Sequence, residues 1–273
     1  MYDFYFGSRE EIERDPARYL LTIKRMLPRW CNSIPDSEFL ALHNLVAGCD
    51  LPPRPVFLET GSGASTLVLA YWALATDGEL FTWDIDGVKL AYLRGVLGDT
   101  LLRHFTDANL HAHWKYIAFS STSGYAGIPI LREMGKEVSV CFFDSEHTRD
   151  VLMGEVDPAC DVVRDGAILA IDDGNYAYIH HNTAYINMVR RKLGLPPIPE
   201  APGNTGRPFW KEVEEYLRTR FRRVDHLEDT YKKTYPSDLF WSYFRSDRET
   251  MAGLAMEKTA DLEHRFDAWQ VFR

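Results

Sequence analysis

Between residues 56 and 173 the chain alternates short apolar runs with longer segments of helical length, and this alternation limits the fold more than any other feature. Five apolar runs are predicted as strands, at 56–60, 79–85, 110–119, 138–144 and 167–173. Helices are predicted between and after them, at 64–76, 87–103, 124–135 and 149–163. Strands that alternate with helices form βαβ units and a parallel sheet with helices on both faces. The sequence therefore predicts a doubly wound α/β domain.

An N-terminal helical extension or cap is predicted over residues 1–53. It contains one helix over 9–30 and a second over 36–48, for which Asp36 is a candidate N-cap. Its bases Arg14, Arg18, Lys24, Arg25 and Arg29 are expected on a solvated face or against an anionic acceptor.

The main domain is predicted to cover 54–245, with a lid-like insertion at 176–208. The insertion ends in a Pro- and Gly-rich loop, 194–208, which has the length of many binding loops. A helix over 209–220 and an antiparallel edge hairpin built from 221–231 and 239–246 are expected next. The last segment, 246–273, is predicted to be a C-terminal helix, centred on 247–266.

Composition and charge exclude several classes of protein. The 273 residues include 31 basic and 40 acidic side chains, a net charge of −9, which argues against a nucleic-acid partner. No apolar run approaches the roughly 20 residues of a membrane helix, and no secretory signal is visible. The four cysteines form no C-x-x-C pair. We expect a cytoplasmic protein with reduced thiols and no membrane partner.

A glycine-rich loop, FLETGSGAST at 57–66, connects the first strand to the first helix of the series. Gly61 and Gly63 permit a tight turn and a close approach to a ligand, and the helix that follows offers unpaired N–H groups to an anion. Asp84 ends the next strand, 84 − 63 = 21 residues after the second glycine. A carboxylate at that place can bind both hydroxyls of a ribose. The loop therefore predicts a nucleotide-like ligand.

Two details of the loop restrict the ligand. A nicotinamide fingerprint requires a third glycine where this chain has Thr66, and no G-K-[ST] follows for a P-loop. Glu59 would repel a pyrophosphate but could bind an ammonium group. An NAD(P)-dependent oxidoreductase and a non-catalytic cofactor-binding module remain as alternatives.

The E-x-G-x-G pattern resembles that of class I S-adenosylmethionine-dependent methyltransferases. The resemblance implies that the loop passes the amino-acid part and sugar of S-adenosylmethionine, that Ser65 helps to hold its carboxylate, and that Asp84 binds its ribose. It also implies a polar residue after the third strand that meets the adenine, for which Ser121 and Ser123 are candidates. The resemblance contributes to the expected count of seven strands and to the edge hairpin. The complete set of expected cofactor contacts is Glu59, Gly61, Ser62, Gly63, Ser65, Thr66, Asp84, Ser121, Ser123 and Asp144.

Acidic residues also end the fourth and fifth predicted strands, at Asp144 and at Asp172–Asp173. The carboxyl ends of parallel strands open on one edge of the sheet, so these side chains are expected together. Carboxylate oxygens are the ligands that Mg²⁺ prefers. The three aspartates are therefore candidate metal ligands.

The pattern D-x-x-H after the fourth strand and D-D after the fifth resembles metal-dependent O-methyltransferases, of the catechol type and more so of the sugar and antibiotic type. The resemblance implies that Asp144, Asp172 and Asp173 bind Mg²⁺. The catechol type has its basic lysine where this chain has His147, and the sugar type has an aspartate where this chain has Glu146, so either residue is a candidate general base.

The prediction is therefore Mg²⁺-assisted methyl transfer from S-adenosylmethionine to a hydroxyl of a small molecule. The leading acceptor is a sugar unit of a surface polysaccharide or of a specialised metabolite, and an anionic or nucleotide-linked sugar is one candidate. Tyr176, Tyr178, His180 and His181 are candidates for the acceptor pocket, and a homo-oligomer is a candidate assembly.

Overall fold

A computed structural model describes residues 7–32, 34, 36–105, 108–146, 149–172, 191, 194, 196–197, 210–224 and 267–271. Several sequence predictions fall outside these residues: most of the lid-like insertion at 176–208 with its loop at 194–208, the strand at 239–246 and the helix at 247–266. His147, Asp173, Tyr176, Tyr178, His180 and His181 also lie outside the described residues.

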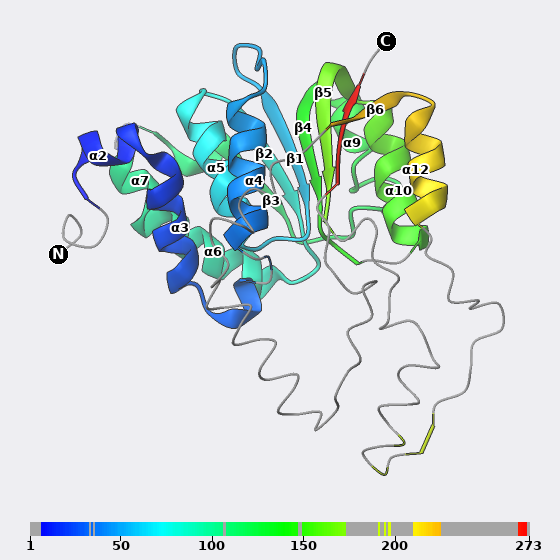
Figure 1. The fold of residues 1–273 in the computed structure, drawn as a ribbon, viewed down its shortest axis with the longest axis horizontal. Coiled ribbons are helices and arrows are strands. Elements are labelled where there is room, and N and C mark those ends of the chain that lie inside the picture. Colours follow the sequence, from blue (N-terminus) through cyan, green and yellow to red (C-terminus); the bar gives the residue numbers. More distant parts are fainter. Residues whose placement is uncertain are drawn as a thin grey trace.

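A sheet of seven strands forms the centre of the described structure, in the order β3-β2-β1-β4-β5-β7-β6 (Figure 1). Its bounds are β1 Val56–Thr60, β2 Glu79–Trp83, β3 Trp114–Ile117, β4 Val138–Phe143, β5 Val163–Ile171, β6 Phe221–Val224 and β7 Asp267–Val271. Strands β1 to β5 pair in parallel, whereas β7 pairs antiparallel with both β5 and β6. The predicted parallel α/β sheet is confirmed for these five strands.

The C-terminal end of the chain differs from the prediction. Residues 267–271 form β7, between β5 and β6, where the sequence predicted helix. The described partner of β6 is thus β7, and the expected partner at 239–246 lies outside the described residues. The sheet therefore includes a strand from outside the predicted 54–245 domain. Pairing with β5, about a hundred residues earlier, is a long-range interaction that local sequence pattern does not contain.

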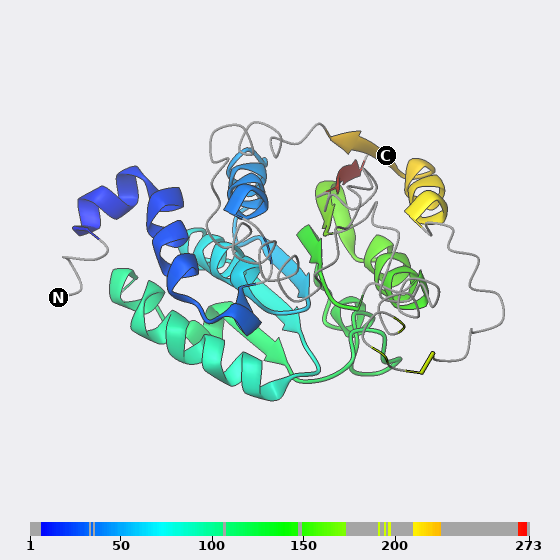
Figure 2. The ribbon, with the colours of Figure 1, turned by 60° about the horizontal axis from the view of Figure 1, so that its bottom comes forward.

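Helices cover both faces of the sheet (Figures 1 and 2). One face carries α2 Arg9–Arg14, α3 Pro16–Met26, α4 Asp36–Ala47, α5 Ala64–Ala75, α6 Gly87–Asp99 and α7 Leu101–His104. The other carries α9 Ile130–Glu133, α10 Arg149–Cys160 and α12 Trp210–Arg218. Side chains alternate along the strands, so that in β1 Phe57 enters the first core and Leu58 the second.

Several predicted helices and strands have different limits in the structure. The expected helix at 9–30 is interrupted at Asp15, because Pro16 starts a new helix whose Arg18 N–H is accepted by the Asp15 carboxylate. The expected helix at 87–103 divides at Thr100 into α6 and α7. Of the helix expected at 124–135, only α9 forms.

The third strand is shorter than the sequence predicted. Residues 110–113 form a helical turn, α8 Leu110–His113, and β3 begins only at Trp114. The turn is capped by Asn109, whose side chain accepts a hydrogen bond from the N–H of His111 at 3.0 Å. A local side-chain cap therefore overrides the strand pattern here.

The N-terminal extension is part of the first core. Ile12, Leu20 and Phe39 lie in the same apolar cluster as Leu67 of α5 and Phe57 of β1. The extension therefore packs on the sheet domain through an apolar interface.

The prediction that the basic residues of the first helices lie on a solvated face is wrong for Lys24. Its side chain is fully buried, and its ammonium group donates to Asp36 at 2.7 Å. Arg25, half exposed, binds the second oxygen of Asp36 at 2.7 Å. Asp36 is the first residue of α4 and not its N-cap. The Lys24–Asp36 pair thus holds α3 to the start of α4.

No helix of the described residues is long and apolar enough to cross a membrane. All four cysteines carry free thiols.

Candidate functional site

Four residues that directly follow strands stand in one row at the carboxyl edge of the sheet. The register pairs Thr60 with Trp83 on one side and with Phe143 on the other. Phe143 in turn pairs with Ile171. The next residue of each strand therefore completes the row, in the order Asp84, Gly61, Asp144, Asp172. The prediction that acids from separate strands meet at one edge is confirmed for Asp84, Asp144 and Asp172.

Gly61 is required by its backbone conformation and by its neighbour. Its φ is +75°, in the left-handed region, and a Cβ built on it would lie 1.8 Å from the carbonyl oxygen of Asp144. Its N–H donates to the carbonyl of Trp83 at 2.8 Å. Gly63 has an extended backbone, and among the described residues a Cβ there would meet the Cys31 carbonyl, at 3.3 Å. The first glycine thus allows two strand ends to meet, and it also lines the cavity described below.

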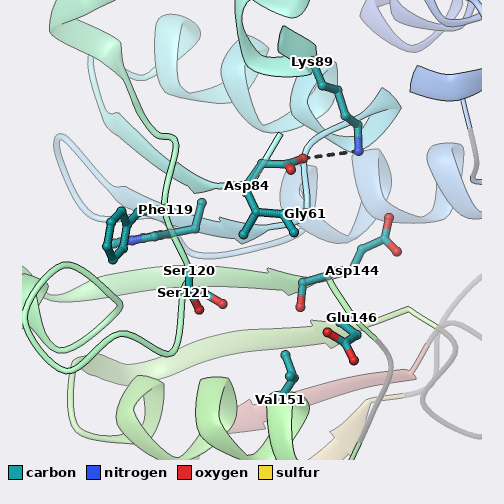
Figure 3. Close-up of a pocket in the computed structure, with 12 residues that line it drawn as sticks. Gly61, Asp84, Lys89, Phe119, Ser120, Ser121, Asp144, Glu146 and Val151 are labelled. Carbon is teal, nitrogen blue, oxygen red and sulfur yellow. Dashed lines mark ion pairs between the residues drawn. The ribbon is translucent and has the colours of Figure 1, made fainter. Parts of the chain in front are cut away.

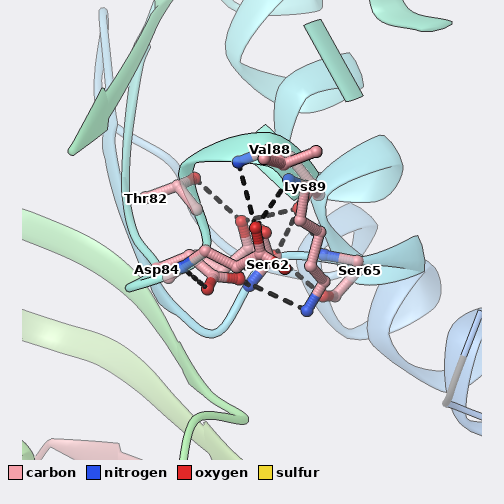
Figure 4. Close-up of polar contacts among 10 residues, drawn as sticks. Ser62, Ser65, Thr82, Asp84, Val88 and Lys89 are labelled. Carbon is pink, nitrogen blue, oxygen red and sulfur yellow. Dashed lines mark hydrogen bonds and ion pairs between the residues drawn. The ribbon is translucent and has the colours of Figure 1, made fainter. Parts of the chain in front are cut away.

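Asp84 is held by four contacts (Figure 4). One of its oxygens accepts from the Ser62 N–H at 2.8 Å and from the Ser62 hydroxyl at 2.5 Å, and lies 3.3 Å from the Lys89 ammonium. The other accepts from the Asp86 N–H at 2.8 Å. Burial alone would raise the pKa of Asp84, but these hydrogen bonds and the Lys89 charge outweigh it and lower the pKa. Asp84 is therefore a fixed carboxylate at the end of β2.

Glu59 does not reach the sheet edge, which corrects its prediction as a cofactor contact. It lies inside β1, is completely buried, and accepts hydrogen bonds from the hydroxyls of Ser65 at 2.7 Å, Thr66 at 2.9 Å and Thr82 at 2.8 Å. Burial raises its pKa to about 7. Ser65 and Thr66, which were also predicted to contact the cofactor, are buried, and their hydroxyls bind the Glu59 carboxylate. The three side chains fix the β1–α5 connection from within, and the Thr66 hydroxyl also accepts the Gly63 N–H at 3.0 Å.

A cavity of about 350 Å³ opens beside the Asp84–Gly61–Asp144 part of the row (Figure 3). Its described lining consists of Gly61, Trp83, Asp84, Ile85, Lys89, Phe119, Ser120, Ser121, Asp144, Ser145, Glu146 and Val151. This volume is within the roughly 300–1,000 Å³ range of small-molecule sites. The cavity brings together Gly61, Asp84, Ser121, Asp144 and Glu146 from the predicted site. Ser62 stands behind Asp84, and Ser123, half-buried, is not part of the lining.

Sequence reasoning missed several lining residues, among them Lys89, Phe119 and Ile85. Lys89 pairs with Asp84, and Phe119 and Ile85, 43% and 83% exposed, give the cavity apolar walls. Exposed apolar residues directly after strand ends are a signal that could have indicated Ile85 and Phe119. Trp83 is buried and donates its indole N–H to the Ala126 carbonyl at 2.8 Å.

The predicted metal ligands are only partly described. Asp144 lines the cavity, and Asp172 is buried beside it in the row. Among the described residues no group of three or more His, Cys, Asp or Glu side chains could hold a metal ion. Of the three predicted metal ligands, the structure thus describes two neighbouring carboxylates, and the third, Asp173, lies outside the described residues.

Comparison with solved structures gives a likeness that spans nearly the whole chain. The O-methyltransferase TomG from Streptomyces achromogenes, involved in tomaymycin synthesis and solved with SAM, is 16% identical over 95% of this chain and 90% of its own, with a TM-score of 0.52. The chain has the Rossmann-like fold of this methyltransferase. A SAM-dependent methyltransferase from Geobacter sulfurreducens, solved with S-adenosyl-L-homocysteine, is 14% identical over 93% and 98% of the two chains, with a TM-score of 0.48.

An rRNA methylase from Streptococcus thermophilus is 10% identical over 86% of this chain and 95% of its own, with a TM-score of 0.43. No protein-family model matches the sequence, and no curated protein matches it. The described cavity lies where α/β sheets of this fold class bind ligands, at the carboxyl ends of the strands.

Proposed function

We propose that the protein transfers a methyl group from S-adenosylmethionine to a hydroxyl of a small molecule. The observation that carries the proposal is the pair of aspartates on either side of Gly61 in the cavity, within a fold shared with TomG. The acceptor we propose is a sugar unit of a polysaccharide or of a specialised metabolite, following the resemblance to sugar and antibiotic O-methyltransferases.

The charges of the cavity support a cationic ligand. Its described lining carries three carboxylates, Asp84, Asp144 and Glu146, against one ammonium group, Lys89. Such a lining favours a ligand with a sulfonium and an ammonium group over one with a pyrophosphate. This is the main argument against the nicotinamide alternative.

The chain's own residues would bind, orient and deprotonate. Asp84 would bind the ribose hydroxyls, since it stays a carboxylate under its lowered pKa. Glu146, exposed at the cavity, or His147, outside the described residues, would accept the proton of the acceptor hydroxyl. S-adenosylmethionine, when bound, supplies a methyl group on a positively charged sulfur. Acceleration would then come chiefly from in-line positioning of the two reactants and from electrostatics.

Magnesium is a separate part of the proposal. Asp144 and Asp172 are oxygen ligands on adjacent strand ends, a donor chemistry that fits Mg²⁺, but the described residues do not complete a site. Asp144, Asp172 and Asp173 would hold the ion, which would favour the ionised form of an acceptor hydroxyl.

Calorimetry tests the cofactor assignment first. The full chain is titrated with S-adenosylmethionine, S-adenosylhomocysteine and NAD⁺, each with and without Mg²⁺. Binding of the two sulfur compounds and not of NAD⁺ is expected. Binding of NAD⁺ alone would overturn the proposal in favour of an oxidoreductase. If the sulfur compounds bind but turnover of a hydroxyl acceptor is insensitive to chelator, the magnesium part is wrong and the methyltransferase part stands.

A further inference from the structure

A second buried carboxylate, Glu155 of α10, joins three strand ends on the face of the sheet opposite Glu59. Its side chain is 1% exposed. One oxygen accepts hydrogen bonds from the hydroxyls of Ser121 and of Ser145, the latter at 2.6 Å. The other accepts from the Thr60 hydroxyl at 3.0 Å. Thr60 is the last residue of β1, and Ser121 and Ser145 lie in the segments that follow β3 and β4, so one side chain connects all three.

Two of these three partners line the cavity, whereas Glu155 itself does not. Ser121 belongs to the wall that follows β3, and Ser145 to the wall that follows β4, between Asp144 and Glu146. Ser145, which stands between Asp144 and Glu146, and Ser121 on the other wall therefore donate to the same buried oxygen. Val151, one turn before Glu155 on α10, also lines the cavity.

The wall after β3 also packs closely on α10. A Cβ at Gly154 would lie 3.0 Å from Cγ2 of Thr122, so this glycine permits the loop to approach the helix. The Ser121 carbonyl accepts the Ile128 N–H at 2.9 Å, which closes the loop upon itself. The Ser121 hydroxyl is then the loop's polar connection to α10, through Glu155.

We propose that Glu155 is a positioning residue, which holds the β3 wall and the β4 wall of the cavity at a fixed separation and so determines affinity for the adenosyl ligand. The proposal rests on the proposed function for the identity of that ligand. A charged acceptor is suited to this role, because hydrogen bonds to a carboxylate in a buried setting are stronger than neutral ones. Since both serine hydroxyls donate to Glu155, their remaining lone pairs are the groups they can offer to a ligand.

Three variants distinguish a positioning role of Glu155 from a contribution to the stability of the fold alone. Glu155→Leu removes both serine contacts with little change of volume. Glu155→Gln retains an amide oxygen for the two serines and an amide N–H for the Thr60 oxygen, so it should preserve the walls. Thr60→Val is the matched control, because it removes the Glu155 contact on the core side and leaves both cavity contacts.

The readouts are the Kd of S-adenosylhomocysteine by calorimetry and the thermal midpoint of each variant. We expect about tenfold weaker binding for Glu155→Leu, and binding within about threefold of the unmodified protein for Glu155→Gln and Thr60→Val. If Thr60→Val weakened S-adenosylhomocysteine binding as much as Glu155→Leu, the proposal would be overturned. Unchanged binding by a folded Glu155→Leu protein would overturn it as well.

Hydrogen exchange of the unliganded protein gives a readout that does not depend on the cofactor. Glu155→Leu should speed exchange of amides in both 119–123 and 144–146, and Thr60→Val should not. Should Glu155→Leu fail to fold, the double variant Ser121→Ala, Ser145→Ala removes the same two contacts and should speed exchange in both segments. Unchanged exchange there overturns the positioning role. Absence of any binding by the unmodified protein contradicts the proposed function instead, and leaves the exchange experiment to decide about Glu155.

Discussion

The carbonyl oxygen of Asp144 occupies the space that a side chain on Gly61 would need, 1.8 Å from the position of a Cβ. The ends of β1 and β4 can lie this close only because residue 61 has no side chain and tolerates a φ of +75°. This contact places Asp144 next to the glycine loop and gives the cavity one of its walls.

Gly61→Ala is therefore expected to lower the free energy of unfolding by about 2–4 kcal/mol, from backbone strain together with displacement of the β4 end. Urea denaturation of the variant measures the change. Gly63→Ala is the control: its backbone is extended and its nearest neighbour is at 3.3 Å, so a loss of about 1 kcal/mol or less is expected. Equal losses for the two variants would contradict the contact with Asp144.

Asp84→Asn should weaken S-adenosylhomocysteine binding by about 10- to 100-fold, because a neutral amide keeps the Ser62 contact less well and loses the charge at the ribose position. Calorimetry measures the Kd. Asp77→Asn makes the same chemical change at an exposed acid before the start of β2, at the opposite end of the strand from the cavity, and should leave binding unchanged. Wild-type affinity in Asp84→Asn would remove Asp84 from the site.

Glu59 should make stability depend on pH in the direction opposite to an ordinary ion-paired acid. Its folded pKa of about 7 lies above the ordinary glutamate value of 4.5, so the stability it contributes is complete below pH 4.5 and is lost as pH rises toward 7. This difference between the folded and ordinary pKa corresponds to about 3 kcal/mol. Denaturation of the protein and of Glu59→Gln at pH 4.5 and pH 8 should show the difference between them changing by up to that amount. A difference that does not vary with pH would contradict the raised pKa.

Lys24→Met should cost about 3 kcal/mol or more, because it leaves the buried Asp36 carboxylate without the ammonium group that binds it at 2.7 Å. The double variant Lys24→Met, Asp36→Asn should recover part of the loss, since the buried charge is then gone as well. Thermal and urea denaturation measure both. Arg18→Met, at an exposed base of the same helix, is the comparison and should change stability by about 0.5 kcal/mol or less.

Much of the parallel sheet could be predicted because its signals are local. Strands at 56–60 and 138–143 are apolar runs of the right length, and the structure has them within one residue of the predicted limits. Asp84 and Asp144 were found for the same reason: an acid one place after a buried strand must lie at the open edge of a parallel sheet.

Two errors at the site concern which face of a strand or helix a side chain occupies. Glu59 was expected to contact the cofactor, but the alternation of side chains along β1 turns Glu59 toward α5 and Thr60 toward α10. Glu155 was missed although it shares the buried face of α10 with Leu152 and Val156, a place where a carboxylate needs partners.

The sequence by itself determined the order of strands and helices along β1 to β5, the glycine turn and the acids at the strand ends, because each depends on residue period and chain geometry within a short segment. The tertiary structure decided what depends on distant partners. It paired residues 267–271 with β5 and formed the buried ion pair between Lys24 and Asp36. It also surrounded Glu59 and Glu155 with hydroxyls from separate elements. A buried polar group is stable only when its hydrogen bonds are satisfied, and those partners meet only once the chain has folded.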